Sequence, residues 1–457
     1  MALKDLIRIV LLGLWTLSLP ALADVTEYQL DNGMQVIVKE DHRAPVAVSQ
    51  VWYRVGASYE PDGITGISHA LEHMMFKGTP QVGAGEFSRI ISALGGTENA
   101  FTGSDYTAYF ETLAVEHLER ALELEADRMR NLLLDADEFA KEIAVVKEER
   151  RLRTEDKPSG RVYEQFNAVA WRSSPYRNPI IGWMNDLEHM TIDDLTAWYR
   201  RWYAPNNATL VVVGDVEPET VRAIAQRHFG TLAPSEPVAQ KPVEEPPQAG
   251  ETRVTVRVPA RQPFLVMGYK TPIIGQAPEP WEPYALHLAA SVLDGGDSAR
   301  LSRELIRGSG IAAGAGAEYT SYGRLPNMFT LDGTPTDGHS VEELEQALRA
   351  AVARLREELV DESELQRVIT QAVASKVYEA DSLFYQAMQI GMLETLGLDW
   401  RLLDQEIAAL KAVTPEQVRS VARRYLTDDN LTVAVLDPLP IEKSAPRAAA
   451  AGGHHGS

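Results

Sequence analysis

The sequence repeats itself once. Residues 191–213 and 414–435 each carry a helix-capping threonine, an amphipathic segment with two adjacent arginines, a short turn and a run of apolar residues. A constant offset of 223 positions aligns Thr191 with Thr414 and Asn207 with Asn430. Self-similarity over this distance indicates that the chain is built from two related halves, each containing a helix followed directly by a strand.

A proline-rich stretch separates the two halves. Residues 233–251 contain five prolines and several acidic residues, a composition that cannot bury a core and is typical of a semi-extended linker. The end of the chain is of low complexity, with runs of alanine and glycine. We therefore expect an N-terminal domain over residues 24–236, a linker over 237–251, a C-terminal domain over 252–440 and a disordered tail over 441–457.

Both strand and helix patterns occur within the first half. Residues 25–30 and 34–39 flank an Asn-Gly turn, which predicts a hairpin, and residues 46–55 predict a third strand. Residues 115–134 and 137–153 have the periodicity of helices. We expect an α+β fold of two homologous domains, each an antiparallel or mixed β-sheet packed with helices.

The first 23 residues predict a secretory signal peptide. Lys4 and Arg8 precede an apolar run over residues 9–19, and a small-x-small sequence ends at Ala23, after which we expect cleavage. The alternative is an uncleaved anchor, but the run is shorter than the about 20 residues that a span requires. We therefore expect no stable membrane span and, in a Gram-negative bacterium, a periplasmic location.

Composition excludes several classes of function. The chain has no cysteine, so disulfides, thiolate metal sites and cysteine nucleophiles are impossible. Its 44 basic and 65 acidic residues give a net charge of −21, which disfavours binding to a phosphate backbone. We expect no nucleic-acid partner.

One short motif has the residue types and the spacing of a metal-binding site. His69 and His73 are four residues apart, with Glu72 three residues after the first histidine. On a helix the three side chains share one face, so two imidazoles can bind one cation while the carboxylate lies beside an open coordination position. This arrangement predicts a zinc hydrolase in which the carboxylate is the general base.

A catalytic zinc needs a third protein ligand, and a later helix offers three acids. Glu142 and Glu149 are seven residues apart and share a face, whereas Glu148 is rotated by about 100° from Glu149. One of the adjacent pair can coordinate the metal while another acid orients a histidine or the bound water.

The spacing of these residues resembles the pitrilysin family of inverted-zincin metallopeptidases. The order H-x-x-E-H inverts the thermolysin-type motif, and an acid follows 76 positions after the second histidine, at Glu149. Three short segments are also similar to the family: LDNGMQV at residues 30–36, EHMMFKGT at 72–79 and GTENAFT at 96–102. The repeat of two halves is similar to the family as well. Length favours its short bacterial and mitochondrial branch, whose chains pair into a clamshell chamber.

This resemblance implies a metalloendopeptidase with one zinc ion per chain. It implies that His69, His73 and Glu149 are the zinc ligands, that Glu72 is the general base and that Glu142 supports the site from behind the ligands. It also implies that Asn99, Ala100 and Phe101 belong to an edge strand along which an extended peptide or unfolded polypeptide binds.

The second half departs from the family's pattern. Active members carry an arginine and, seven residues later, a tyrosine that bind substrate, and the alignment places Ile306 and Ala313 at these positions. Arg307 and Tyr319 lie nearby and could form a shifted pair. The simpler interpretation is that a homologous zinc-less subunit supplies the pair in a heterodimer, with a homodimer as the alternative.

Two further alternatives remain at this stage. The chain could be a non-catalytic structural or peptide-binding subunit, although all four residues of the metal site are present, or a zinc hydrolase of non-peptide amides. The remaining histidines show no ligand-like spacing, and we expect them on the surface or in the core: His42, His117, His189, His228, His287 and His339.

Overall fold

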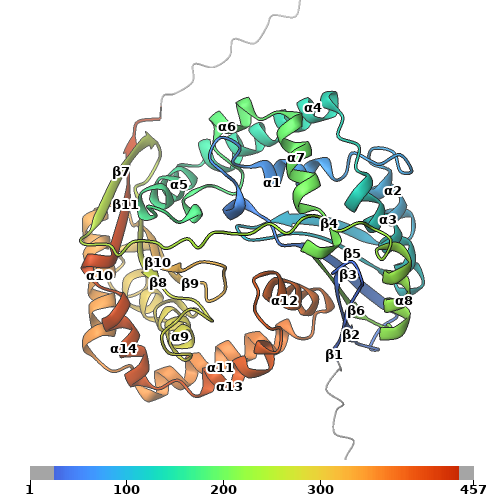
Figure 1. The fold of residues 1–457 in the computed structure, drawn as a ribbon. Helices are drawn as coiled ribbons and strands as arrows, with labels where there is room; N and C mark the ends of the chain where they lie inside the picture. The colour runs from blue at the N-terminus through green and yellow to red at the C-terminus, as the bar shows by residue number, and fades with distance from the viewer. Residues whose placement is uncertain (1–24, 442–457) are drawn as a thin grey trace, which may run out of the picture.

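The computed structural model describes residues 25–441 and contains two β-sheets, each packed with helices (Figure 1). The predicted signal peptide lies outside these residues, as does the predicted tail beyond residue 441. Among the described residues, no helix is long and apolar enough to cross a membrane.

The first sheet has six strands in the order β1-β2-β6-β3-β5-β4. Only β2 and β6 are parallel, so the sheet is mixed. The predicted hairpin is present as β1 and β2, and the predicted third strand as β3. The strands are β1 Val25–Gln29, β2 Gln35–Glu40, β3 Val46–Tyr53, β4 Thr97–Thr102, β5 Thr107–Ala114 and β6 Ala208–Gly214.

The second sheet has five strands in the order β7-β11-β8-β10-β9, again with one parallel pair, β7 and β11. Two mixed sheets with helices confirm the predicted α+β class. The strands are β7 Thr252–Pro259, β8 Phe264–Thr271, β9 Ala312–Tyr319, β10 Asn327–Pro335 and β11 Leu431–Leu439.

From residue 25 onward, eight α-helices precede the second sheet in the sequence: α1 Ile67–Met74, α2 Glu86–Ala93, α3 Leu118–Asn131, α4 Ala136–Arg150, α5 Pro158–Ala170, α6 Met184–His189, α7 Ile192–Trp202 and α8 Pro218–His228. Helices α3 and α4 are the two predicted from periodicity; a π-helical turn, Arg151–Glu155, continues α4. Six more follow: α9 Glu282–Asp294, α10 Val341–Glu357, α11 Glu362–Glu379, α12 Leu383–Thr395, α13 Leu402–Lys411 and α14 Pro415–Tyr425.

The repeat found in the sequence has the same local structure in both copies. Thr191 and Thr414 each close a capping box at the start of α7 and α14. Asn207 donates to the carbonyl of Trp202, and Asn430 donates to that of Tyr425, both at 2.9 Å. The side-chain amide thus ties the end of each helix to the strand that follows it.

One helix from each half of the sequence packs on the sheet of the other half. Helix α5 packs on β7, β11 and β8 of the second sheet, whereas α12 packs on β3 and β6 of the first (Figure 1). Phe166 and Val162 are buried against Val266 in the first contact, and Ile390 and Ala387 are buried in the second. The first residues of the two helices are 225 positions apart, close to the repeat offset, so equivalent helices are exchanged.

The proline-rich stretch forms neither helix nor strand from residue 234 to 250. It is fixed at both ends of its path: Asn206 donates to the Ser235 carbonyl at 2.8 Å, and Gln248 donates to the Leu431 carbonyl at 2.7 Å. Figure 1 shows it as a thin green connecting segment that crosses the molecule from the first sheet to the second.

Candidate metal centre

Helix α1 presents the H-x-x-E-H motif beside the first sheet. Its first turn is held by Glu60, whose carboxylate accepts hydrogen bonds from the backbone N–H of Gly66 at 2.6 Å and of Ser68 at 2.8 Å. Gly66 has a φ of 87°, and a Cβ there would lie 2.5 Å from the carbonyl oxygen of Ile181. Only glycine fits this turn without strain, so the start of α1 is fixed closely.

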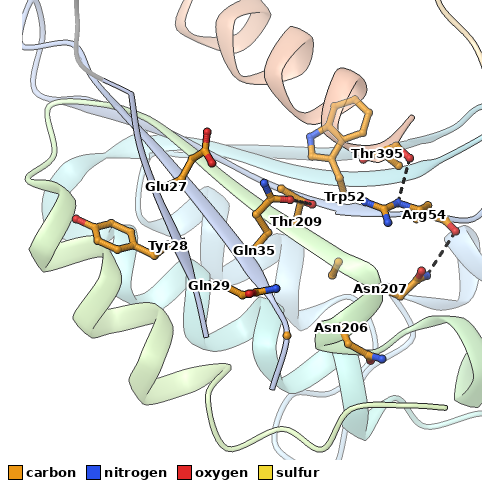
Figure 2. A pocket seen from close by; sticks show the side chains of 12 residues that line it. Glu27, Tyr28, Gln29, Gln35, Trp52, Arg54, Asn206, Asn207, Thr209 and Thr395 are labelled. Atoms are coloured by element: carbon orange, nitrogen blue, oxygen red, sulfur yellow. Dashed lines mark hydrogen bonds between the residues drawn. The ribbon is translucent and has the colours of Figure 1, made fainter. Parts of the chain in front are cut away.

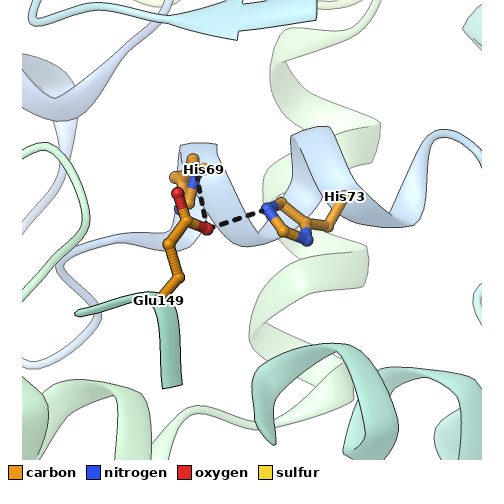
Figure 3. A group of neighbouring side chains, drawn as sticks. All are labelled: His69, His73 and Glu149. Atoms are coloured by element: carbon orange, nitrogen blue, oxygen red, sulfur yellow. Dashed lines mark ion pairs between the residues drawn. The ribbon is translucent and has the colours of Figure 1, made fainter. Parts of the chain in front are cut away.

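His69, His73 and Glu149 converge at one point between α1 and α4 (Figure 3). The Glu149 Oε2 lies 3.7 Å from His69 Nε2 and 3.5 Å from His73 Nε2. Ligands that bind zinc tetrahedrally at about 2.0–2.1 Å lie about 3.3 Å apart. The spacing and the donor types therefore fit a zinc ion held by two imidazoles and one carboxylate.

A second carboxylate lies behind this group. Glu142 Oε2 is 3.2 Å from Nδ1 of His73, and its Oε1 pairs with the Lys77 ammonium at 2.6 Å. An acid on the distal nitrogen fixes the imidazole's tautomer and orientation, so that Nε2 faces the metal position. Arg153 pairs with the other oxygen of Glu149 at 2.6 Å, one helical turn further along.

Glu72 lies on the same face of α1 as the two histidines. Burial raises the pKa of its carboxyl, an effect opposed by a hydrogen bond from the Thr102 hydroxyl. A raised pKa favours proton uptake, which is the property that a general base needs when it must later return the proton. The carboxyl of Glu72 thus takes up a proton more readily than an exposed glutamate does.

His69 is buried, with 8% of its surface exposed. Burial, and then the neighbouring His73, lower the pKa of His69 to about 3. A neutral imidazole is the form that binds metal, and the lowered pKa favours this form of His69.

Strand β4 forms the edge of the first sheet, next to α1. It pairs with β5 on one side and with no strand on the other within residues 25–441. Asn99 is exposed, whereas Ala100 and Phe101 are half-buried. Because Thr102 at the end of this strand contacts Glu72, an extended chain added to the open edge would pass beside the candidate general base.

Comparisons with known proteins agree with this geometry. Residues 35–183 match the family described as Insulinase (Peptidase family M16), and residues 189–372 match the Peptidase M16 inactive domain. The chain belongs to peptidase family M16. The resemblance drawn from the motifs is thereby confirmed.

Several M16 relatives are named as zinc proteases. The chain is 31% identical to the zinc protease PqqE of Helicobacter pylori over 90% of this chain and 92% of that protein. It is 27% identical to the uncharacterized zinc protease YmxG of Bacillus subtilis, over 91% and 98%. A crystal structure of a protease from H. pylori superimposes with a TM-score of 0.87 at 29% identity, covering 91% of this chain and all of that one. Zinc and peptidase activity are therefore properties of its M16 relatives.

The structure distinguishes the two adjacent acids of this M16 chain. Glu148 points to solvent, where 60% of its side chain is exposed and it pairs with Arg151. Glu149 is only 18% exposed and faces both histidines. The two acids that the sequence left as alternatives thus have different surroundings.

Arg307 and Tyr319, the candidates for a shifted arginine and tyrosine pair, both have hydrogen-bond partners within the second half of this M16 chain. Ile306 packs against the second core, and Ala313 lies exposed on β9. The Arg307 guanidinium donates to the Asp297 carbonyl. Tyr319 is buried, and its hydroxyl donates to a backbone carbonyl at 2.7 Å.

Three residues of the site were not predicted from the sequence: Thr102, Lys77 and Arg153. Thr102 lies in the word GTENAFT, and Arg153 is four residues after Glu149 on the continuation of α4. The (i, i+4) spacing of Arg153 could have been found, because such pairs share a helix face. The contact of Thr102 with Glu72 depends on how β4 packs on α1, which no local pattern encodes.

A separate polar cavity of about 530 Å³ lies at the other side of the first sheet (Figure 2). Its lining includes Glu27, Trp52, Arg54 and Asn207. The Arg54 guanidinium donates to the Thr395 carbonyl at 3.2 Å, at the end of α12. This cavity contains no metal-ligating group of three and belongs to the junction between α12 and the sheet.

Proposed function

We propose that this chain is a zinc-dependent endopeptidase that hydrolyses peptides or unfolded polypeptides outside the cytoplasm. We propose further that a partner subunit completes its active site. The observation that carries the proposal is the convergence of His69, His73 and Glu149 on one point, with the half-buried Glu72 on the same helix face. The M16 relatives named as zinc proteases support the same activity.

The roles of the residues follow from their contacts. A bound zinc ion would polarise the scissile carbonyl and lower the pKa of the attacking water. Glu72 takes a proton from this water as its oxygen bonds to the carbonyl carbon. The same carboxyl then gives the proton to the amine nitrogen as the C–N bond breaks, which returns Glu72 to its starting state.

The neighbouring side chains hold this machinery in place. The Thr102 hydroxyl donates to Glu72 and fixes the orientation of its carboxylate. Glu142 orients His73, and Lys77 pairs with the other oxygen of Glu142 and holds its carboxylate beside the ring. The substrate lies along β4 at Asn99, Ala100 and Phe101, so that main-chain hydrogen bonds place a peptide bond beside the metal.

The proposed partner follows from what the second half lacks. With Ile306 and Ala313 at the aligned positions, the arginine and tyrosine that would bind the developing oxyanion from that side are missing from these positions. A homologous zinc-less subunit that keeps the arginine and tyrosine would supply it; a homodimer is the alternative. The N-terminal signal sequence supports action in the periplasm.

Glu72→Gln tests the chemistry. We expect turnover of a quenched-peptide library to fall by at least about 1,000-fold, while bound zinc and the thermal unfolding midpoint stay unchanged. Glu148→Gln is the matched control, because this acid lies on α4 beside a proposed ligand but points to solvent; it should keep full activity. Undiminished turnover by Glu72→Gln would refute the role of the base.

The partner is tested by adding it. The same library is cleaved by the purified chain alone, and again after mixing with a homologous chain encoded beside it that lacks H-x-x-E-H. Activity that appears only in the mixture supports the shared site. Full activity of the chain alone would show that the second half is complete or that a homodimer suffices.

A further inference from the structure

A second group of metal-ligating side chains lies at the far end of the first sheet. Strands β2 and β6 run parallel, and their carboxyl ends meet, with Glu40 opposite Gly214. Glu40 ends β2, His42 follows in the next loop, and Glu217 lies between β6 and α8. One ligand atom from each of the three lies within 4.8 Å of the others. Loops that leave the carboxyl ends of parallel strands are where sheets commonly bind ligands.

The geometry around His42 is that of a metal ligand. Its Nε2 lies 3.5 Å from Glu40 Oε1, which equals the shorter histidine–carboxylate spacing at the first site. Its Nδ1 lies 2.6 Å from the Asp215 carboxylate. A carboxylate on the distal nitrogen fixes the tautomer with Nε2 free to coordinate, the arrangement that accompanies histidines bound to zinc.

No lysine or arginine compensates the charges of this group. Within residues 25–441, neither Glu40 nor Glu217 pairs with a lysine or an arginine. The nearby Arg43 is directed away, towards Asp41 and Asp381. The imidazole of His42 pairs with Glu40 and Asp215, so a divalent ion would compete with the proton for its Nε2.

We propose that Glu40, His42 and Glu217 form a second metal site for zinc or a similar divalent ion, with Asp215 as the positioning residue for His42. It shares no residue and no secondary-structure element with the group on α1 and α4. It is independent of the proposed peptidase activity.

The site stabilises a contact between the two halves. The loop that carries His42 also holds the start of α12: Arg43 donates to the Asp381 carbonyl at 3.0 Å, and Gln386 donates to Asp41 at 3.3 Å. A metal that joins this loop to the β6–α8 connection restrains the loop in the folded state alone. Binding therefore raises the thermal unfolding midpoint.

The test measures zinc itself, on the chain from residue 24 onward. After equilibration with buffered zinc, we expect two ions per wild-type chain, and one in His42→Ala. The His73→Ala variant should also retain one, which assigns the remaining ion to the second site. Asp215→Asn should keep the site but weaken its affinity about 10-fold.

The matched control is His339→Ala. His339 is an exposed histidine whose Nδ1 lies 3.1 Å from Glu343, but it has no third ligand, so this variant should bind two ions. Zinc should raise the unfolding midpoint of His73→Ala, and that rise should vanish in His42→Ala/His73→Ala. His42→Ala that binds as many ions as wild type, or His73→Ala that binds none, overturns the proposal.

Discussion

Glu245 is the residue through which the proline-rich stretch is attached to both halves. Its carboxylate accepts hydrogen bonds from the backbone N–H groups of Arg172, Ser173 and Ser174 at 2.9–3.2 Å. It also pairs with the Lys270 ammonium on β8 at 2.7 Å. One charged group therefore joins the segment after α5, the connecting chain and the second sheet.

These contacts fix the magnitude of the expected effect. Partial burial raises the pKa of Glu245, but Lys270 and the three N–H groups outweigh it and lower the pKa to about 2, from 4.5. At 1.36 kcal/mol per pKa unit this corresponds to about 3 kcal/mol, which we reduce to about 2 kcal/mol for residual solvent screening. A lowered pKa in the folded state means that this stabilisation is complete above pH 4.5 and is lost as the pH falls towards 2.

Glu245→Gln should therefore lower the free energy of unfolding by about 2 kcal/mol at pH 7, and the difference should shrink to roughly half near pH 3. Urea unfolding followed by circular dichroism at both pH values measures it. Glu244→Gln is the control, because its side chain is exposed on the same stretch. The reasoning is refuted if the two variants are equally stable at pH 7, or if the deficit of Glu245→Gln does not depend on pH.

Two other substitutions probe the packing and the site. Gly391→Ala in α12 should destabilise the protein by about 1–3 kcal/mol, because the added Cβ would lie 2.1 Å from Nε1 of the buried Trp52; a thermal unfolding scan measures this, and an unchanged midpoint would contradict the contact. Glu142→Gln should weaken zinc binding about 10- to 100-fold by releasing His73, measured by competition with a chelating dye. Glu138→Gln on the same helix should bind zinc as wild type does, because the Glu138 carboxylate pairs with Lys141 and not with a histidine.

The elements that the sequence predicted well are those with local signals. The Asn-Gly hairpin and the helix caps at Thr191 and Thr414 each depend on residues close together in the chain. The C-terminal end of α4 was predicted less accurately, because a π-helical turn over residues 151–155 continues the helical periodicity beyond the α-helix. The strand order could not be read, since the pairing of β2 with β6 joins residues about 170 positions apart.

In the candidate metal site, too, the sequence predicted the features that depend on local spacing and not those that depend on the packing of distant segments. The motif on α1 and the seven-residue spacing on α4 are helical periodicities, so the sequence grouped their members on common faces. The choice between Glu148 and Glu149 depends on how α4 faces α1, which only the fold determines. The sequence predicted no role for His42, because its neighbours Asp215 and Glu217 follow a different strand.

Because helices are exchanged, the two copies of the sequence repeat are not two independent folding units. A boundary within residues 237–251 divides the two copies of the sequence repeat, but the outer face of the first sheet is covered by α12 from the second copy. Without α12, buried residues such as Trp52, Val211 and Val213 would face water. Loss of this contact would expose several large apolar side chains, and each would reduce the free energy of unfolding by about 1.5–3 kcal/mol. Each half therefore depends on the other for its core, and the single connecting chain, held by Glu245, keeps the two exchange partners in one molecule.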